Sequence, residues 1–117
     1  MGMGPINLYE FEAEAKQVLS HDVWEHIAGG EHDELTLRRN REAFDRITLW
    51  PRHMVEVRNR DLTTTVLGQK IGFPVMLAPA GIQACAHPEG ELAVARAAGT
   101  AGTVMVLGTN SSFSMED

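Results

Sequence analysis

The stretch from Pro74 to Thr109 constrains the fold of this chain more than any other part of its 117 residues. It contains an apolar run that ends at Leu77, a loop with a glycine, an alanine-rich segment and a second apolar run that ends before Gly108. This succession predicts a β-α-β crossover, whose strands lie parallel because the helix returns the chain to its starting edge. Ligands of such units bind at the carboxyl ends of the strands, so the loop after Leu77 is the first candidate binding site.

A single crossover does not complete a parallel sheet, because such a sheet is covered by helices on both faces and its strands are fully buried. The apolar content of 44% is nevertheless that of a globular protein. Either partner copies supply the missing cover or the chain is a piece of a longer protein, and we favour the longer protein. The pattern leaves open whether the crossover begins a doubly wound sheet or a closed eight-stranded barrel. The loop has neither GxGxxG nor GxxxxGK[ST], which argues against dinucleotide and Walker-type phosphate sites.

Three helices are predicted before the crossover. The first spans Asn7 to Leu19, where Glu10 stands at the spacing of a capping box. The second begins near Asp22, and the glycine pair 29–30 is expected to end it in the left-handed conformation. The third covers about Asp33 to Phe44. The side chains that the second helix is expected to bury are Trp24, Ile27 and Ala28.

An extended segment at 50–52 and a small antiparallel hairpin, with Gly68 in its turn, follow the helices. Within the crossover, His87-Pro88-Glu89 predicts a helix start, with Glu89 and Glu91 favourably placed in its first turn. Ser114 to Asp117 resembles the cap of a further helix.

Composition excludes several classes of partner. The net charge of −6 argues against nucleic acid, which requires a basic surface. Eight acidic residues lie between Glu10 and Glu34 and seven arginines between Arg38 and Arg60. These segments are interpreted as oppositely charged solvated faces, with a subunit contact as the alternative.

The sequence contains no apolar run long enough to span a bilayer and no export-signal pattern in MGMGPINLYEF. The single cysteine, Cys85, cannot form an internal disulfide and is interpreted as a packing residue, so we expect a cytoplasmic protein. The five histidines show no metal-ligand spacing, and no metal is predicted.

The loop and helix APAGIQACAHPEGELAVARAAGTAGT resemble the first barrel crossover of the FMN-dependent α-hydroxy acid dehydrogenases and oxidases. This family includes glycolate oxidase, lactate oxidase and mandelate dehydrogenase. Further blocks resemble it in the same order: AGGEHDELTLRRNREAFDRI, Pro51-Arg52, DLTTT with Leu67-Gly68, and LGTNSS. The resemblance covers nearly the whole chain.

The resemblance implies the N-terminal part of a (β/α)8 TIM barrel that binds FMN at the carboxyl ends of its strands. Residues 1–46 would form a helical cap, 47–73 an extended and hairpin segment across the bottom, and 74–117 the first barrel β-α-β unit. It also implies that Pro79, Ala80 and Gly81 lie beside the flavin and that Gly108 contributes a further contact. Many members have serine at that last position, so Gly108 leaves only a backbone or water-mediated contact.

Members often place a tyrosine in the helical segment to bind the substrate carboxylate, and His26 falls at that position. A histidine can donate a hydrogen bond to a carboxylate. The alternative is a packed or solvated histidine; His32 is expected to face solvent, and His87 is assigned a structural role.

The implied reaction is oxidation of a small L-2-hydroxy acid to the 2-oxo acid. The family's histidine base, arginine clamp and lysine belong to later strands, so no catalytic residue is assigned here, and the chain alone is predicted to be inactive. The alternatives are a non-catalytic remnant or interaction module, and the flavin-dependent isopentenyl-diphosphate isomerase. The family also implies a homo-oligomer for the complete protein.

Overall fold

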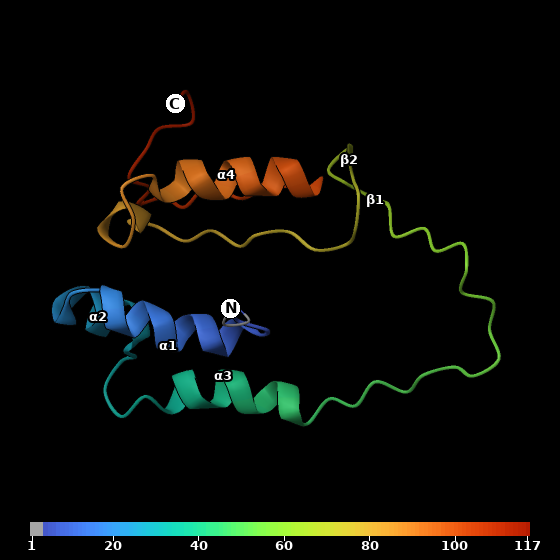
Figure 1. Cartoon of the computed structure of the whole chain (residues 1–117), viewed down its shortest axis with the longest axis horizontal. Coiled ribbons are helices and arrows are strands. Elements are labelled where there is room, and N and C mark those ends of the chain that lie inside the picture. The colour runs from blue at the N-terminus through green and yellow to red at the C-terminus, as the bar shows by residue number, and fades with distance from the viewer. Residues whose placement is uncertain (1–3) are drawn as a thin grey trace. The chain divides into compact units, whose positions relative to one another are not determined.

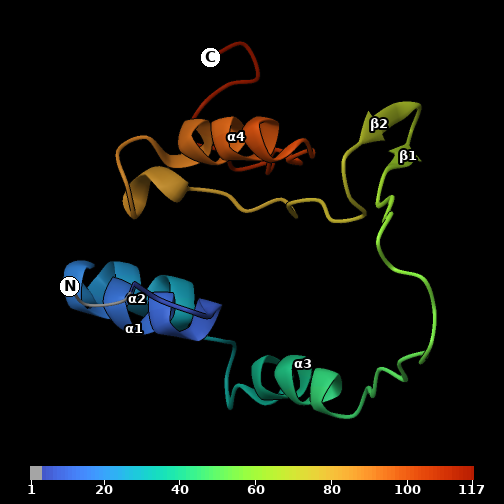
Figure 2. The same cartoon turned by 45° about the vertical axis from the view of Figure 1, so that its right-hand side comes forward.

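The computed structural model describes residues 4–117, which divide into two compact units. One unit ends at His53 and contains the three helices, and the other runs from Met54 to Asp117 and contains the hairpin and the crossover (Figures 1 and 2). Residues 1–3 lie outside the described residues. They belong to the predicted helical cap, 1–46, and to the N-terminal stretch in which no export signal was found.

The first unit consists of α1 (Leu8–Val18), α2 (His21–Ala28) and α3 (Leu35–Asp45). The Asn7 side chain accepts hydrogen bonds from the backbone N–H of Tyr9 and Glu10, at 2.9 and 3.1 Å, and so caps α1 as predicted. The Glu10 carboxylate completes a variant of the capping box, because it accepts from Ile6 N–H at 2.9 Å instead of from Asn7 N–H.

The prediction for the end of α2 was wrong in its conformation. Gly29 is extended, with φ −76° and ψ 159°. A Cβ at Gly29 would lie 2.6 Å from the Glu25 carbonyl oxygen, so glycine is required here by close approach to the preceding turn. The burial prediction was also too strong: Trp24 and Ala28 are half-buried, but Ile27 is 53% exposed, because three short helices cannot cover one another's apolar faces fully.

Opposite charges do meet inside the first unit. The Arg41 guanidinium of α3 lies 3.9 Å from the Glu12 carboxylate of α1 and over the Tyr9 ring, 4.0 Å from its centroid. An exposed pair of this kind contributes about 0–1 kcal/mol, so it stabilises the first unit only weakly.

The predicted hairpin is present in the second unit as β1 (Thr64–Val66) and β2 (Gln69–Ile71), paired antiparallel with Val66 opposite Gln69. Its turn residues, Leu67 and Gly68, both have positive φ, at 48° and 83°. This is the conformation of a two-residue type I′ turn, whose twist matches that of the strands.

The predicted crossover is confirmed by a parallel bridge between Leu77 and Met105. Leu77 N–H donates to Val104 O and Val106 N–H donates to Leu77 O, each at 3.0 Å. The chain between Leu77 and Met105 contains the 3-10 helix η1 (Gln83–Cys85) and α4 (Gly90–Ala101). The extended chain that leads from β2 to η1 runs alongside α4 (Figure 1). The expectation of fully buried strands was wrong, because this pair has no flanking strands: Leu77 is 37% and Val106 42% exposed.

The carboxyl end of α4 joins the crossover to the hairpin. Gly102, with φ 72°, ends the helix, and Thr103 N–H returns to Ala98 O at 3.0 Å as in a Schellman motif. The freed Gly102 carbonyl accepts from Gly72 N–H at 2.7 Å, immediately after β2. At the chain's end, Ser114 Oγ accepts from Glu116 N–H at 3.3 Å, a capping contact, but residues 114–117 form a turn and not the predicted helix.

Candidate functional site

Two loops meet at the carboxyl ends of the bridged segments. We call residues 78–84 loop 1 and residues 108–114 loop 2. The N–H of Ile82 donates to Asn110 O at 2.8 Å, and the N–H of Ala84 donates to Ser112 Oγ at 3.1 Å. The crossover therefore brings together the segments that contain Pro79, Ala80, Gly81 and Gly108.

The two loops approach each other closely, with a glycine on each side of the contact. A Cβ at Gly108 would lie 3.0 Å from both the carbonyl carbon and the oxygen of Ala80. A Cβ at Gly81 would lie 2.7 Å from the Asn110 carbonyl oxygen. A side chain at Gly108 would therefore require loop 1 to shift by a few tenths of an ångström.

Loop 1 has the properties of a seat for a flat ring. Pro79, Ala80 and Gly81 are exposed and carry only small side chains. Among residues 4–117, no hydrogen bond engages the N–H of Ala80 or of Gly81. Free main-chain donors beside a surface without bulky side chains fit the polar edge of a flavin ring.

The backbone of loop 1 is strained at its last turn. Ile82 has φ 54° and ψ 34°, the left-handed conformation that β-branched residues avoid. Such a conformation costs on the order of 1–3 kcal/mol and persists where surrounding contacts over-determine it.

The contacts that hold this turn converge on Glu91, in the first turn of α4. Its side chain is only 2% exposed, and its Oε1 accepts from the N–H of Gln83 and of Ser112, at 3.1 Å each. Burial alone would raise the pKa of Glu91, but these backbone N–H groups, with its own N–H and the Ser112 hydroxyl, lower it below its ordinary value. Sequence reasoning placed Glu91 at a helix start and missed this role, because the two N–H groups come from separate loops.

The family model described as FMN-dependent dehydrogenase matches residues 15–117 of this sequence. The chain belongs to the FMN-dependent dehydrogenase family. The resemblance predicted from the sequence is therefore confirmed, and so is the dependence of the family on FMN.

Named relatives of this family have similar sequences. The chain is 50% identical to glycolate oxidase of Spinacia oleracea over 95% of its own length and 30% of that protein. It is 50% identical to L-lactate oxidase of Nostoc sp. over 97% of its length and 31% of that protein. The chain thus spans about 30% of the length of the curated relatives it matches.

Solved structures of the family show the same backbone arrangement. A mandelate oxidase matches with a TM-score of 0.90 and 36% identity over 96% of this chain and 33% of its own. The monotopic membrane protein (S)-mandelate dehydrogenase matches with a TM-score of 0.91 and 33% identity, over 98% and 31% respectively. The predicted fold class, an incomplete (β/α)8 barrel, is confirmed.

The other residues singled out in the sequence are not part of loops 1 and 2. His26 is exposed on the last turn of α2, in the first unit, and His32 is solvent-facing as expected, 93% exposed. His87 Nδ1 accepts from Glu89 N–H at 3.2 Å beside the predicted helix start, which is confirmed at Gly90. Cys85 is exposed in η1, so its assignment as a packing residue was wrong.

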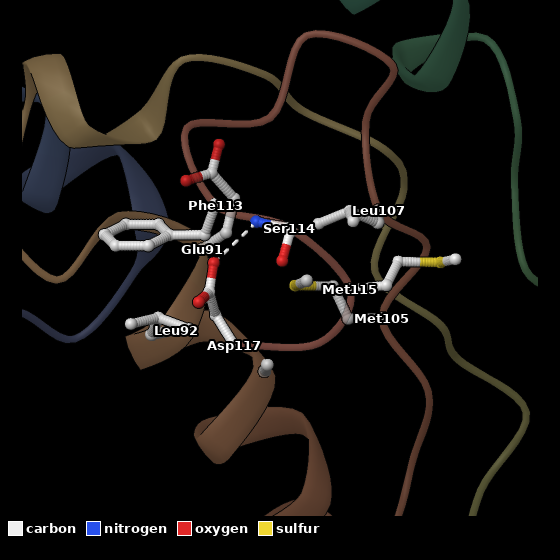
Figure 3. Close-up of a pocket in the computed structure, with 9 residues that line it drawn as sticks. Glu91, Leu92, Met105, Leu107, Phe113, Ser114, Met115 and Asp117 are labelled. Carbon is white, nitrogen blue, oxygen red and sulfur yellow. Dashed lines mark hydrogen bonds between the residues drawn. The ribbon is translucent and has the colours of Figure 1, made fainter.

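A pocket of about 340 Å³ lies beside α4 (Figure 3). Apolar side chains from α4, the second bridged segment and the chain's end predominate in it: Leu92, Ala95, Met105, Leu107, Phe113 and Met115. Asp117 also lines the pocket and accepts from Ser114 N–H at 2.8 Å (Figure 3). None of the predicted FMN contacts lines this pocket, which has the apolar character of a packing surface.

The described residues, 4–117, contain no group of three or more side chains placed to hold a metal ion. In the same part of the chain, no helix has the length and apolarity needed to cross a membrane.

Proposed function

We propose that the whole protein oxidises a small L-2-hydroxy acid to the corresponding 2-oxo acid with FMN. The observation that carries the proposal is the paired approach of loops 1 and 2 within an FMN-dependent dehydrogenase crossover. The glycolate oxidase and lactate oxidase relatives supply the substrate class. Bound FMN would supply the acceptor for the two electrons removed from the substrate.

The part of this chain in that activity is to hold the cofactor. We propose that Pro79, Ala80 and Gly81 face the flavin with their main-chain groups and that Gly108 adds a backbone contact. The exposure of residues 79–81 and the unpaired N–H groups of Ala80 and Gly81 among residues 4–117 support this assignment.

The 117 residues alone are proposed to be inactive. Oxidation of the substrate requires a base, a carboxylate clamp and the flavin within hydrogen-bonding reach of one carbon. One parallel bridge and one crossover helix do not fix such a constellation. Turnover of a 2-hydroxy acid by the separate chain, once loaded with FMN, would refute this proposal.

The test of the whole activity is anaerobic titration of the full-length protein. We expect an FMN absorbance spectrum that glycolate or L-lactate bleaches, with D-lactate as the mismatched control. A protein that retains no FMN after reconstitution, or a flavin that no 2-hydroxy acid reduces, would contradict the proposal and favour a non-catalytic module.

His26 is proposed to donate a hydrogen bond to the substrate carboxylate. Its exposure on the last turn of α2 leaves the imidazole available to a ligand. In the full-length protein, His26→Phe should raise KM for the 2-hydroxy acid, and His32→Phe, at an exposed histidine beyond the same helix, is the matched control. An unchanged KM in His26→Phe would remove the role.

The complete protein is further proposed to be a cytoplasmic homo-oligomer, on the strength of its single cysteine and its family. Sedimentation of the full-length protein tests the oligomer, and fractionation of its host cell tests the location.

A further inference from the structure

We propose that Glu91 is a positioning residue for the flavin: its buried carboxylate fixes the shape of loop 1 and its register against loop 2. The inference rests on the proposed function, because loop 1 matters to the reaction only if it receives FMN. Glu91 lies behind both loops and does not belong to the surface assigned to the cofactor.

One oxygen joins the two loops. Glu91 Oε1 accepts from Gln83 N–H in loop 1 and from Ser112 N–H in loop 2, both at 3.1 Å. Ser112 also links the loops directly, because its Oγ accepts from Ala84 N–H at 3.1 Å. Two neighbouring backbone N–H groups of loop 1 are thus tied to loop 2 through Glu91 and Ser112.

A second set of contacts extends from this junction to the proposed flavin surface. Gln83, whose backbone Glu91 holds, donates through its side-chain Nε2 to the Ala80 carbonyl at 3.0 Å. The Ala80 carbonyl is also the group against which Gly108 packs. The Gln83 side chain therefore links the Glu91 carboxylate to Ala80, and Ala80 in turn contacts Gly108 of loop 2.

The strained backbone at Ile82 needs hydrogen bonds on both sides to keep its conformation. Ile82 is left-handed and directly precedes Gln83. Its N–H is fixed by Asn110 O at 2.8 Å and the following N–H by Glu91. If the second contact is lost, the turn at Ile82 can relax toward a conformation of lower energy, which would move Ala80 and Gly81.

The burial of Glu91 indicates that its polar contacts are the reason for its presence. A carboxylate enclosed at 2% exposure loses its hydration, and among the described residues its Oε2 has no hydrogen-bond partner. If the side chain at position 91 only filled space, an apolar residue would be more stable there, because it has no charge to desolvate. Two positions earlier, Glu89 is exposed and pairs with Arg96 at 2.6 Å, which makes it the matched control.

The experiment compares Glu91→Ala, Glu91→Gln and Glu89→Ala in the full-length protein. FMN affinity of the apoprotein is measured by flavin fluorescence, and the visible circular dichroism of bound flavin reports the surroundings of the ring. Glu91→Ala should weaken FMN binding at least about tenfold, the effect expected from losing hydrogen bonds to a charged acceptor, and should alter the dichroism. Glu91→Gln should restore most of the affinity, because its amide oxygen can accept from both N–H groups, and Glu89→Ala should match the wild type.

If Glu91→Ala does not fold, the variant Gln83→Ala tests the same chain of contacts to loop 1. It removes the contact with Ala80 and leaves the buried carboxylate in place, so it should weaken FMN binding without loss of thermal stability. Wild-type FMN affinity and dichroism in either Glu91→Ala or Gln83→Ala would overturn the inference. A wild-type protein that binds no FMN would instead refute the proposed function, so the two failures are distinguishable.

Discussion

At the scale of single residues, the close approach of loops 1 and 2 limits which side chains can stand at their contact. Gly108 and Gly81 each lie where a Cβ would meet main-chain atoms of the opposite loop. Gly99, in contrast, has open space around its Cβ position inside α4. The same substitution is therefore expected to have opposite effects on stability at Gly108 and at Gly99.

We expect Gly108→Ala to destabilise the full-length protein by about 1–3 kcal/mol, because the added methyl group overpacks the contact with Ala80. The measurement is the free energy of unfolding in urea. Gly99→Ala is the control and should stabilise by about 0.4–1 kcal/mol through a lower entropy of the unfolded chain. Equal stability of Gly108→Ala and the wild type would mean that the loops are not in contact.

The acid sensitivity of the fold should depend on Glu91. Its pKa in the folded protein is lowered from the ordinary 4.5, so the ionised carboxylate stabilises the fold above that pH. The contribution is lost as the pH falls below 4.5 through the folded pKa. The difference in Tm between wild type and Glu91→Gln should therefore be constant from neutral pH to about 5 and shrink below 4.5; a difference that does not change with pH would contradict the assignment.

At the scale of elements, turn chemistry explains the hairpin and also marks its weak point. Leu67 occupies the first central position of the type I′ turn with φ 48° and is fully exposed. Leucine gains no burial there and bears the steric cost of the left-handed conformation. Gly68, at φ 83°, bears none.

Replacing Leu67 by asparagine should raise the stability of the full-length protein by on the order of 1 kcal/mol, because Asn-Gly is the preferred pair in such turns. Thermal unfolding measures the gain. Leu62→Asn, at an exposed leucine with no positive φ, should give no increase. A fall in Tm for Leu67→Asn would show that Leu67 packs against another part of the whole protein.

The elements also show which features the sequence could predict. The order of apolar run, loop glycine, alanine-rich segment and second apolar run was sufficient to predict the Leu77–Met105 crossover. The β-branched residues together with a turn glycine were sufficient to predict the hairpin. The contacts of Glu91 were not predictable, because they depend on loops 1 and 2 lying together. Exposure of Cys85 and Ile27 was missed for a related reason, since periodicity indicates which side chains share a face but not what covers it.

At the scale of the whole molecule, the chain has very little interior. Among the described residues, the buried apolar side chains are Ile71 and Ala98, whereas large ones such as Phe44 and Trp50 are 76% and 94% exposed. Hydrophobic burial is the main favourable term in folding. The 117 residues alone therefore lack the driving force that a chain of their length normally has.

Produced alone, the chain should bind the dye ANS and unfold without a sharp thermal transition, because its exposed apolar surface remains accessible. The full-length protein, measured in parallel, should show a cooperative transition and little dye binding. A single sharp transition in the separate chain, with matching signals from circular dichroism and fluorescence, would contradict this prediction.

The junction at Glu91 has a consequence for synthesis of the protein. It joins positions only 8 and 21 residues apart, so closing it costs little chain entropy. All of its members have left the ribosome once Ser112 has emerged, and domains generally fold from the N-terminus during synthesis. The edge that we assign to the cofactor can thus take shape on the nascent polypeptide as soon as Ser112 is free, shortly after the hairpin and the Leu77–Met105 bridge.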